Sequence, residues 1–325
     1  MHRYFLMFIV CGTIGCLWVS CQKETTPFDQ RIMSTPTQQA LQGAYFLNDS
    51  IGFAMGGSTY SQSTLLHTSN GGQTWSLVDL GFDKIVYDMI FTTPAEGFLT
   101  GYDAKVLHTT DTGKTWIIEQ LHGNLAWLPM YGIDFASPNT GVIVGGKGNS
   151  TGIIFQTSNG GQTWQQTYTS PSELRDIDFA NATEGYAVGY GLVLKTNDGG
   201  QTWQTLDAKG DFFFAVHFPT EQVGYVVGNQ GTILKTSNSG YSWQTLRNGN
   251  SPFKKRLHFT DVWFKDADNG FVLAENCLLQ TTNGGQTWQQ YDLLCHTNRG
   301  LWFRSSDSVL LIVGEQGCIS QVEVS

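Results

Sequence analysis

The chain has 325 residues, of which only 14% are charged, well below the ~25% of an average domain. Its 38 glycines, 10 tryptophans and 40% hydrophobic residues exclude disorder as a description of the whole chain and favour many short strands joined by tight turns. The net charge of −9 and the pI near 5.1 argue against nucleic-acid binding, because that function needs a basic face to displace counterions.

The N-terminal segment, residues 1–20, has the pattern of an export signal. A short basic start precedes the apolar residues 4–19, which are too few for a membrane span. Cys21, followed by polar residues, resembles a bacterial lipobox, in which the cysteine is acylated, although Trp18 stands where leucine is usual. We therefore expect an exported, membrane-anchored lipoprotein of the bacterial cell envelope. A plain secretory signal with an incidental cysteine is the alternative.

Residues 21–30 are predicted to form a polar tether. Removal of residues 1–20 deletes Arg3 and no acidic residue, so the net charge changes from −9 to −10. Besides Cys21, only Cys277, Cys295 and Cys318 then remain, too few for a disulfide scaffold and without metal-ligand spacing. We expect buried or lone thiols and no metal or cofactor, with a single bridge from Cys295 to either of the other two left open.

One octapeptide recurs six times and decides the fold. The copies are TSNGGQTW, TTDTGKTW, TSNGGQTW, TNDGGQTW, TSNSGYSW and TTNGGQTW, at residues 68–75, 109–116, 157–164, 196–203, 236–243 and 281–288. Their third position holds Asn70, Asp111, Asn159, Asp198, Asn238 and Asn283, and their last holds Trp75, Trp116, Trp164, Trp203, Trp243 and Trp288. The tryptophans are 41, 48, 39, 40 and 45 residues apart, the length of a four-stranded propeller blade.

The residue types in the octapeptide suit a hairpin turn. Asn or Asp at the third position bonds the downstream backbone, and glycine at the fifth supplies a positive φ. A β-rich stretch precedes each copy, so we expect the octapeptide to join the third and fourth strands at the outer rim of a blade. Its predicted role is structural rather than catalytic.

The remainder of each unit repeats as well. First strands are predicted to end at Phe46, Phe91, Phe135, Phe179, Phe218, Phe264 and Phe303. That makes seven first strands but six octapeptides, and the last unit, residues 301–325, holds only three strands. Residues 31–35 fall where the missing strand belongs. The sequence therefore predicts an all-β chain, with residues 31–325 forming one seven-bladed propeller of four-stranded antiparallel blades, closed by pairing of the N- and C-terminal strands.

The octapeptides are Asp-boxes, or BNR repeats, which occur in sialidases, sortilin-type receptors and xyloglucanases. The fuller unit, residues 176–179, 185–189 and 196–203, most resembles the photosystem II stability/assembly factor-like family, over about residues 40–325. The resemblance implies a β-propeller. Members in photosynthetic organisms help to assemble photosystem II, but similar propellers occur in bacteria without a photosystem, so the family name does not transfer a partner.

A propeller usually acts through the end where its fourth-to-first connections and second-to-third loops gather. Four residues before each phenylalanine, the predicted ring there reads Gln42, Tyr87, Tyr131, Arg175, Phe214, Thr260 and Arg299. Arginine forks and stacking tyrosines suit an acidic or glycan partner; the alternative is a packed wall with solvated arginine tips. The long connections add Trp127 and the basic run Lys254, Lys255 and Arg256 to this partner-binding face.

Aspartates occupy the next position of the ring in alternate blades, as Asp88, Asp176 and Asp261. Such carboxylates suit either a cation site or hydrogen bonds to the backbone of the adjacent blade. We expect the backbone role and no metal.

The favoured function is a non-catalytic binding or assembly scaffold, a monomer that holds a protein or a glycan and no nucleic acid. The alternative is a sialidase-like glycoside hydrolase or a glycan-binding module. A sialidase needs an arginine triad and a tyrosine nucleophile, but only Arg175 and Arg299 share a ring position. Arg31-Ile32-Met33 partly resembles the sialidase Arg-Ile-Pro, with methionine in place of proline. We therefore expect no enzyme activity.

Overall fold

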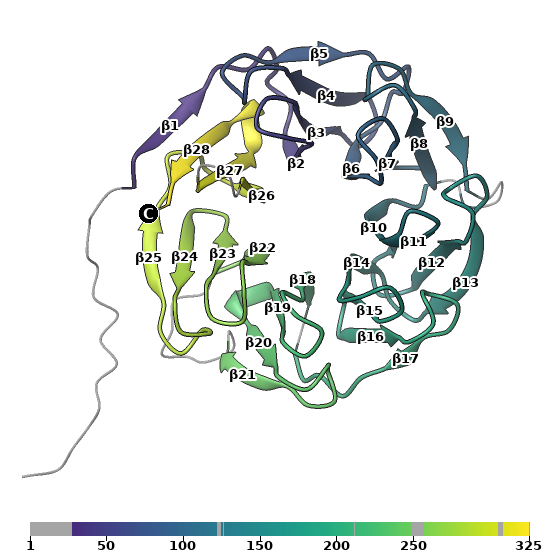
Figure 1. The fold of residues 1–325 in the computed structure, drawn as a ribbon, viewed down its shortest axis with the longest axis vertical. Helices are drawn as coiled ribbons and strands as arrows, with labels where there is room; N and C mark the ends of the chain where they lie inside the picture. The colour runs from purple at the N-terminus through teal and green to yellow at the C-terminus, as the bar shows by residue number, and fades with distance from the viewer. Residues whose placement is uncertain are drawn as a thin grey trace, which may run out of the picture.

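The protein is described by a computed structural model that covers residues 28–121, 125, 127–210, 212–248, 257–304 and 308–324. These residues form seven four-stranded antiparallel sheets, arranged around a common axis as the blades of a β-propeller (Figure 1). The predicted fold and blade number are confirmed. The predicted signal segment, with Cys21, lies outside the described residues, as do Lys254, Lys255 and Arg256.

The first six blades each use four consecutive strands, ordered from the axis outward. Blade 1 comprises β2 (Leu41–Phe46), β3 (Gly52–Ser58), β4 (Gln62–Thr68) and β5 (Ser76–Val78). Blade 2 comprises β6 (Val86–Phe91), β7 (Gly97–Gly101), β8 (Lys105–Thr109) and β9 (Ile117–Gln120). Blade 3 comprises β10 (Met130–Ser137), β11 (Thr140–Lys147), β12 (Thr151–Thr157) and β13 (Gln165–Ser170).

The second half of the ring follows the same plan. Blade 4 comprises β14 (Leu174–Phe179), β15 (Gly185–Gly189), β16 (Leu192–Thr196) and β17 (Gln204–Thr205). Blade 5 comprises β18 (Phe213–His217), β19 (Gly224–Gly228), the 3₁₀ turn η1 (Asn229–Gly231), β20 (Ile233–Thr236) and β21 (Gln244–Arg247). Blade 6 comprises β22 (Phe259–Phe264), β23 (Gly270–Ala274), β24 (Cys277–Thr281) and β25 (Gln289–Asp292).

Blade 7 closes the ring with strands from both ends of the chain. It comprises β26 (Asn298–Arg304), β27 (Val309–Gly314), the turn η2 (Glu315–Gly317), β28 (Ile319–Glu323) and β1 (Gln30–Met33). β1 lies beside β28, with Gln30 opposite Val322 and Met33 opposite Ile319 (Figure 1). The closing strand is thus slightly earlier than residues 31–35, because Thr35 already leaves the ladder and donates its hydroxyl to the Gly317 carbonyl at 2.8 Å.

A disulfide between Cys295 and Cys318 reinforces this closure, with the two Cα atoms 6.0 Å apart. It joins the connection between blades 6 and 7 to the residue that precedes β28. The expectation of buried or lone thiols is therefore wrong for this pair. Cys277 is buried in blade 6 and lies outside the bridge.

An aromatic pair lies in the core of blades 1, 2, 3, 5 and 6. The phenylalanine of the first strand meets the box tryptophan edge-on, as in Phe46 and Trp75, whose ring centroids are 6.0 Å apart. The same phenylalanine covers the glycine that opens the second strand, and a Cβ on Gly52 would lie 2.5 Å from the Phe46 ring. Only a residue without a side chain fits beneath the ring, so this glycine is required for packing and not for its φ.

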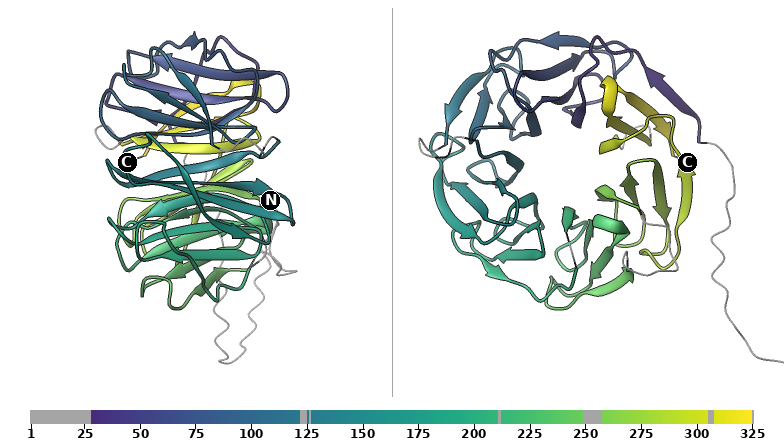
Figure 2. Two further views of the ribbon diagram at one scale, coloured as in Figure 1. Left: turned by 90° about the vertical axis from the view of Figure 1, so that its right-hand side faces the viewer. Right: turned by 180° about the vertical axis from the view of Figure 1, so that it is seen from behind.

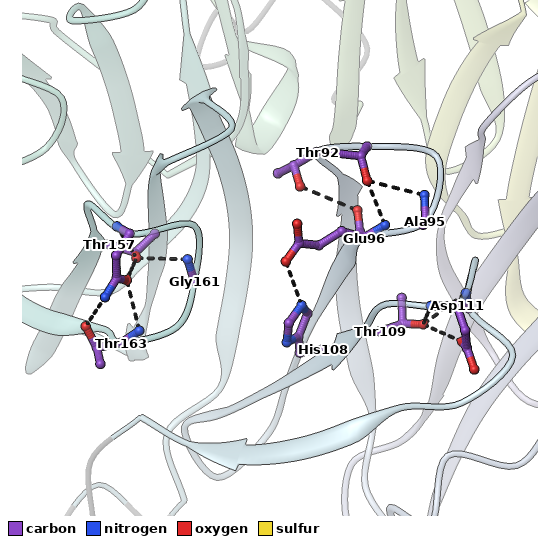
Figure 3. Close-up of polar contacts among 12 residues, drawn as sticks. Thr92, Ala95, Glu96, His108, Thr109, Asp111, Thr157, Gly161 and Thr163 are labelled. Carbon is purple, nitrogen blue, oxygen red and sulfur yellow. Dashed lines mark hydrogen bonds and ion pairs between the residues drawn. The ribbon is translucent and has the colours of Figure 1, made fainter.

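The Asp-boxes form closed hydrogen-bond networks at the third-to-fourth strand turns (Figure 3). In the second box, the Thr109 hydroxyl donates to Asp111 Oδ1 at 2.9 Å and accepts the Gly113 N–H at 3.0 Å. Asp111 Oδ1 also accepts the Thr115 N–H at 2.9 Å. The other five boxes repeat these three bonds at 2.8–3.0 Å. The threonine and the Asn or Asp side chain of each box thus satisfy their own turn.

The strand ends gather at two opposite faces of the ring, which Figure 2 shows edge-on and from behind. We call the face that carries the boxes and the first-to-second strand turns the box face. The opposite face carries the second-to-third loops and the fourth-to-first connections, and we call it the connection face. In the described part of the chain, no helix is long and apolar enough to cross a membrane.

Candidate functional site

The predicted ring lies around the axis at the connection face, and each of its residues is the second residue of a first strand. A register shift interrupts the pairing with the second strand at this position in every blade, for example between Leu174 and Asp176 on either side of Arg175. A β-bulge redirects the side chain of the extra residue. The fold therefore presents the ring side chains through seven equivalent bulges.

Four neighbouring blades bring their ring residues into one aromatic cluster. The rings of Tyr87 and Tyr131 meet at 4.9 Å in a T-shaped pair. The Arg175 guanidinium carbon lies 4.0 Å from the centroid of Tyr131 on one side and 5.8 Å from that of Phe214. Phe212, which the sequence analysis did not single out, adds a third ring at 5.2 Å from the guanidinium. The arginine is thus held among three aromatic rings.

The charge of Arg175 is compensated within the protein. Its Nε and Nη2 atoms lie 2.8 and 2.6 Å from Oε1 of Glu173, and Glu173 is 4% exposed. Oε2 of Glu173 accepts the Gly148 N–H at 2.6 Å. Arginine carries five N–H donors in a planar fork, and the pairing with Glu173 uses one side of it. Arg175 is consequently a positioned hydrogen-bond donor whose charge already has a partner.

Arg299 and Trp127 lie outside this cluster. Arg299 belongs to blade 7, where its Nε donates to Glu315 of η2 at 3.1 Å. The two ring arginines thus form two separate ion pairs, Arg175 with Glu173 and Arg299 with Glu315. Lys254, Lys255 and Arg256 fall outside the described residues, so their place in the predicted face stays a prediction.

Trp127 lies in a second cluster on the connection face. Its side chain is 57% exposed, and its backbone N–H donates to Asp103 Oδ1 at 2.9 Å. Lys84 forms an ion pair with Asp103 and places its Nζ 4.9 Å from the Trp127 ring and 5.9 Å from the Tyr102 ring. Tyr60 packs against Tyr102 with the centroids 5.7 Å apart. Neither tyrosine was predicted, although both come from second-to-third strand loops, which the sequence had assigned to this face.

Three tyrosines of the two clusters, Tyr87, Tyr102 and Tyr131, keep their phenolic protons at physiological pH. Burial raises the pKa of Tyr87 and of Tyr131 above the ordinary value. Burial and the hydrogen bond with Tyr60 raise the pKa of Tyr102 to about 12. A tyrosine nucleophile would need the opposite shift, so these residues act as neutral hydrogen-bond donors.

The ring aspartates bond the backbone of the adjacent blade. Asp176 accepts the Ile177 N–H and, with its other oxygen, the Val216 N–H of blade 5, both at 2.8 Å. Asp88 and Asp261 make the same pair of bonds, to Ile133 and Leu301 of the next blades. The described residues contain no group of three or more His, Cys, Asp or Glu side chains that could hold a metal ion.

Two further aspartates, which the sequence analysis missed, make similar bonds deeper along the axis. Asp134 accepts the Phe179 N–H of blade 4 at 2.7 Å, and Asp178 accepts the Phe218 N–H of blade 5 at 2.6 Å. Burial raises the pKa of Asp88 and of Asp261 to about 7, against two backbone hydrogen bonds that lower it. All five carboxylates therefore serve as clamps between blades.

The described arginines do not assemble the triad of a sialidase. Arg31 lies on the outer strand β1 opposite Gln321, and Arg247 bonds the Gln230 and Gly231 carbonyls. Arg304 donates to the carbonyl of Gly71 in the first box at 3.1 Å. Among the described arginines, only Arg175 and Arg299 stand at the axis, and each is paired with its own glutamate.

A separate groove of about 480 Å³ lies at the ring closure. It is lined by β1, the Cys295–Cys318 bridge and η2. Its lining contains none of the aromatic residues described above.

Several known proteins resemble this chain in sequence or in fold. The family model described as photosynthesis system II assembly factor YCF48 matches residues 69–172, 124–211 and 168–251, together more than half of the chain. Among solved structures, YCF48 bound to a D1 peptide is 22% identical with a TM-score of 0.72, over 91% of this chain and 97% of that one. YCF48 from Cyanidioschyzon merolae is 17% identical with a TM-score of 0.68, over 90% and 98%.

Propellers of other families are similar in fold as well. The structure of U3-55K has a TM-score of 0.71 at 11% identity, over 91% of this chain and 98% of that one. Likeness at these identities shows the fold alone. No curated protein matches the sequence.

Proposed function

The chain belongs to the family of photosynthesis system II assembly factor YCF48, and on that premise we propose that it is a non-catalytic, protein-binding assembly scaffold. A related propeller, YCF48, has been solved with a D1 peptide bound. In this chain, the observation that carries the proposal is the cluster of Tyr87, Tyr131, Arg175 and Phe214 at the connection face. Aromatic and arginine side chains are enriched among the residues that dominate protein interfaces.

We further propose that the protein is an exported lipoprotein attached to a bacterial envelope membrane through Cys21. The topology supports a definite orientation. β1 begins at Gln30 beside the end of β28, at the box face, and runs toward the connection face. Residues 21–30 reach at most about 30 Å when fully extended. The anchor would hold the box face toward the membrane and leave the connection face open to a partner in the aqueous phase.

The local chemistry supports binding rather than turnover. The phenols keep their protons, the described arginines are dispersed, and the buried carboxylates are occupied by backbone N–H groups. Turnover of a fluorogenic sialoside or glucoside by the purified protein would contradict this part of the proposal.

The test is an affinity capture from the protein's own membranes after mild crosslinking. The variant Glu173→Gln/Arg175→Gln removes the ion pair without leaving a buried charge, and Tyr131→Ala removes the stacking ring. We expect both to lose a protein partner that the unmodified protein captures. Tyr241→Ala is the matched control, because Tyr241 is 76% exposed but lies in a box at the opposite face.

Thermal unfolding of each variant shows whether the propeller remains folded. Equal capture by folded Tyr131→Ala and by the unmodified protein would show that the connection face is not the binding face. Absence of any captured protein would refute the scaffold role.

A further inference from the structure

The two aromatic clusters form one continuous surface. The Tyr102 N–H donates to the carbonyl of Ile85 at 3.1 Å, two residues before Tyr87, and the Ala104 N–H donates to the carbonyl of Leu128 at 2.7 Å, three residues before Tyr131. We call this surface the aromatic shelf. It comprises the exposed Tyr60 and Trp127, the half-buried Tyr87, Tyr131, Phe212 and Phe214, and the buried Tyr102, with Lys84 and Arg175 stacked among the rings. It spans the loops and connections of blades 1 to 5.

The two carboxylates of the shelf are occupied. Asp103 receives Lys84 and the Trp127 N–H, and Glu173 receives Arg175 and the Gly148 N–H. These two carboxylates are therefore engaged before any ligand arrives. A sugar, whose hydroxyl groups need acceptors as well as donors, would find the carboxylates beneath the rings already satisfied.

The shelf keeps donors available. The phenolic protons of Tyr60 and Tyr87 and the second edge of the Arg175 fork can each be donated. Because both cations are paired with a carboxylate, an anionic ligand would gain little net Coulomb attraction. A neutral hydrogen-bond acceptor, such as a main-chain carbonyl, does not depend on net Coulomb attraction and can still accept a hydrogen bond from these donors. The shelf therefore combines ring faces with donors for uncharged oxygen atoms.

The shelf is held rigid at its outer end. Trp127 has a φ of 72°, and Asp103 and Ala104 have φ values of 62° and 52°, which non-glycine residues adopt only when their surroundings enforce it. Hydrogen bonds from Gln120 to the carbonyls of Asp103 and Ala104, at 2.9 and 3.0 Å, help to enforce this shape. The backbone N–H of Trp127 is in turn bonded to Asp103, so the tryptophan is tied to this turn through its backbone.

We propose that the aromatic shelf binds an extended, uncharged, proline-rich segment of a partner protein. This inference rests on the proposed function and names the chemistry of its partner. A polyproline II chain has carbonyls without internal hydrogen bonds, and proline has no N–H to donate. It is thus rich in acceptors and poor in donors, the complement of the shelf. Its pyrrolidine rings pack on aromatic side chains such as Trp127 and Tyr131.

Titration calorimetry of the full exported protein with synthetic decaproline tests the proposal. A serine–glycine decapeptide, a serine–glutamate decapeptide and chitotetraose serve as comparison ligands. We expect decaproline to bind and the other three to bind at least about tenfold more weakly. Trp127→Ala should weaken decaproline about fivefold by loss of stacking. Tyr60→Phe, which keeps the ring and removes the hydroxyl, should weaken it about threefold.

Tyr241→Ala, on the box face, should bind decaproline as the unmodified protein does. Absence of decaproline binding, equal binding of the glutamate peptide, or Trp127-dependent binding of chitotetraose would each overturn the proposal. If decaproline fails while membrane capture still depends on Tyr131, the scaffold role stands and the proline-rich partner is wrong. If decaproline binds but no membrane protein is captured, the shelf chemistry stands and the scaffold role fails.

Discussion

Two of the six Asp-boxes carry a non-glycine residue with a positive φ at a position where the other four have glycine. The fourth and fifth positions of every box have positive φ, for example 70° and 80° at Gly160 and Gly161. In two boxes, however, the fourth position holds Thr112 or Ser239, with φ values of 65° and 55°. The sequence predicted a positive φ for the fifth position only. The positive φ at the fourth position could not be predicted from the sequence, because two of the six copies do not have glycine there.

Thr112→Gly is expected to raise the free energy of unfolding by about 0.5–1 kcal/mol. A β-branched residue in left-handed geometry destabilises the folded state by about 1–2 kcal/mol. Glycine removes this strain but also stabilises the unfolded chain through its greater flexibility, so the net gain is smaller. Denaturant titration measures the change. Gly160→Thr is the reciprocal variant, since the nearest atom to its added Cβ is 3.3 Å away, and it should lower stability. A destabilised Thr112→Gly would show that the threonine makes a compensating contact.

At the scale of the strand, the first strands do two jobs through consecutive residues. The bulged residue presents a side chain at the connection face, and in blades 2, 4 and 6 the aspartate after it clamps the next blade. The spacing from the phenylalanines predicted both positions. No residue type in the sequence marked the positions of the bulges. The ion pair between Arg175 and Glu173 depends on the conformation of the connection that precedes β14, which the sequence did not predict. The site's positions were therefore predictable, but its charge state was not.

Raised carboxyl pKa values make stability depend on pH. The folded pKa of Asp88 and of Asp261 is about 7, against an ordinary value of about 3.9 in an unfolded chain. The folded protein thus binds more protons between these values, so its stability falls as pH rises through this window. We expect a higher unfolding temperature at pH 5 than at pH 8. Calorimetric scans across this range measure the slope.

The matched variant is Asp88→Asn/Asp261→Asn, which cannot titrate at either position. It should flatten the pH dependence, whatever its effect on absolute stability. A slope that is unchanged in this variant, or that has the opposite sign in the unmodified protein, would assign the dependence to other groups.

At the scale of the whole molecule, ring closure combines a strand and a disulfide. The sequence predicted the closing strand from a count of seven phenylalanines and six boxes, and the structure confirms it with β1. The disulfide partner could not be chosen from spacing, because it depends on how the ring closes. Cys277 and Cys318 open or precede the third strands of neighbouring blades, whereas Cys295 lies in the connection between those blades. Closure brings that connection to Cys318.

Removal of the bridge in Cys295→Ala/Cys318→Ala should lower the free energy of unfolding by about 3 kcal/mol, as expected for a loop of this length. The sequence separation of the two cysteines is 23 residues. Thermal or denaturant unfolding measures the loss. Reductant should bring the unmodified protein to the stability of the variant and leave the variant unchanged. Equal stability with and without the bridge would mean that β1 and the blade core close the ring by themselves.

The central question is which face of the propeller contacts the partner protein, and photo-crosslinking answers it most directly. A photo-crosslinking amino acid is placed at Phe214 on the connection face and, in a second protein, at Tyr241 on the box face, and each is irradiated in intact membranes. If the connection face binds the partner, the Phe214 position forms a covalent adduct with a protein partner and the Tyr241 position does not. Adducts at Tyr241 alone would contradict it, because the partner would then bind the face that carries the boxes.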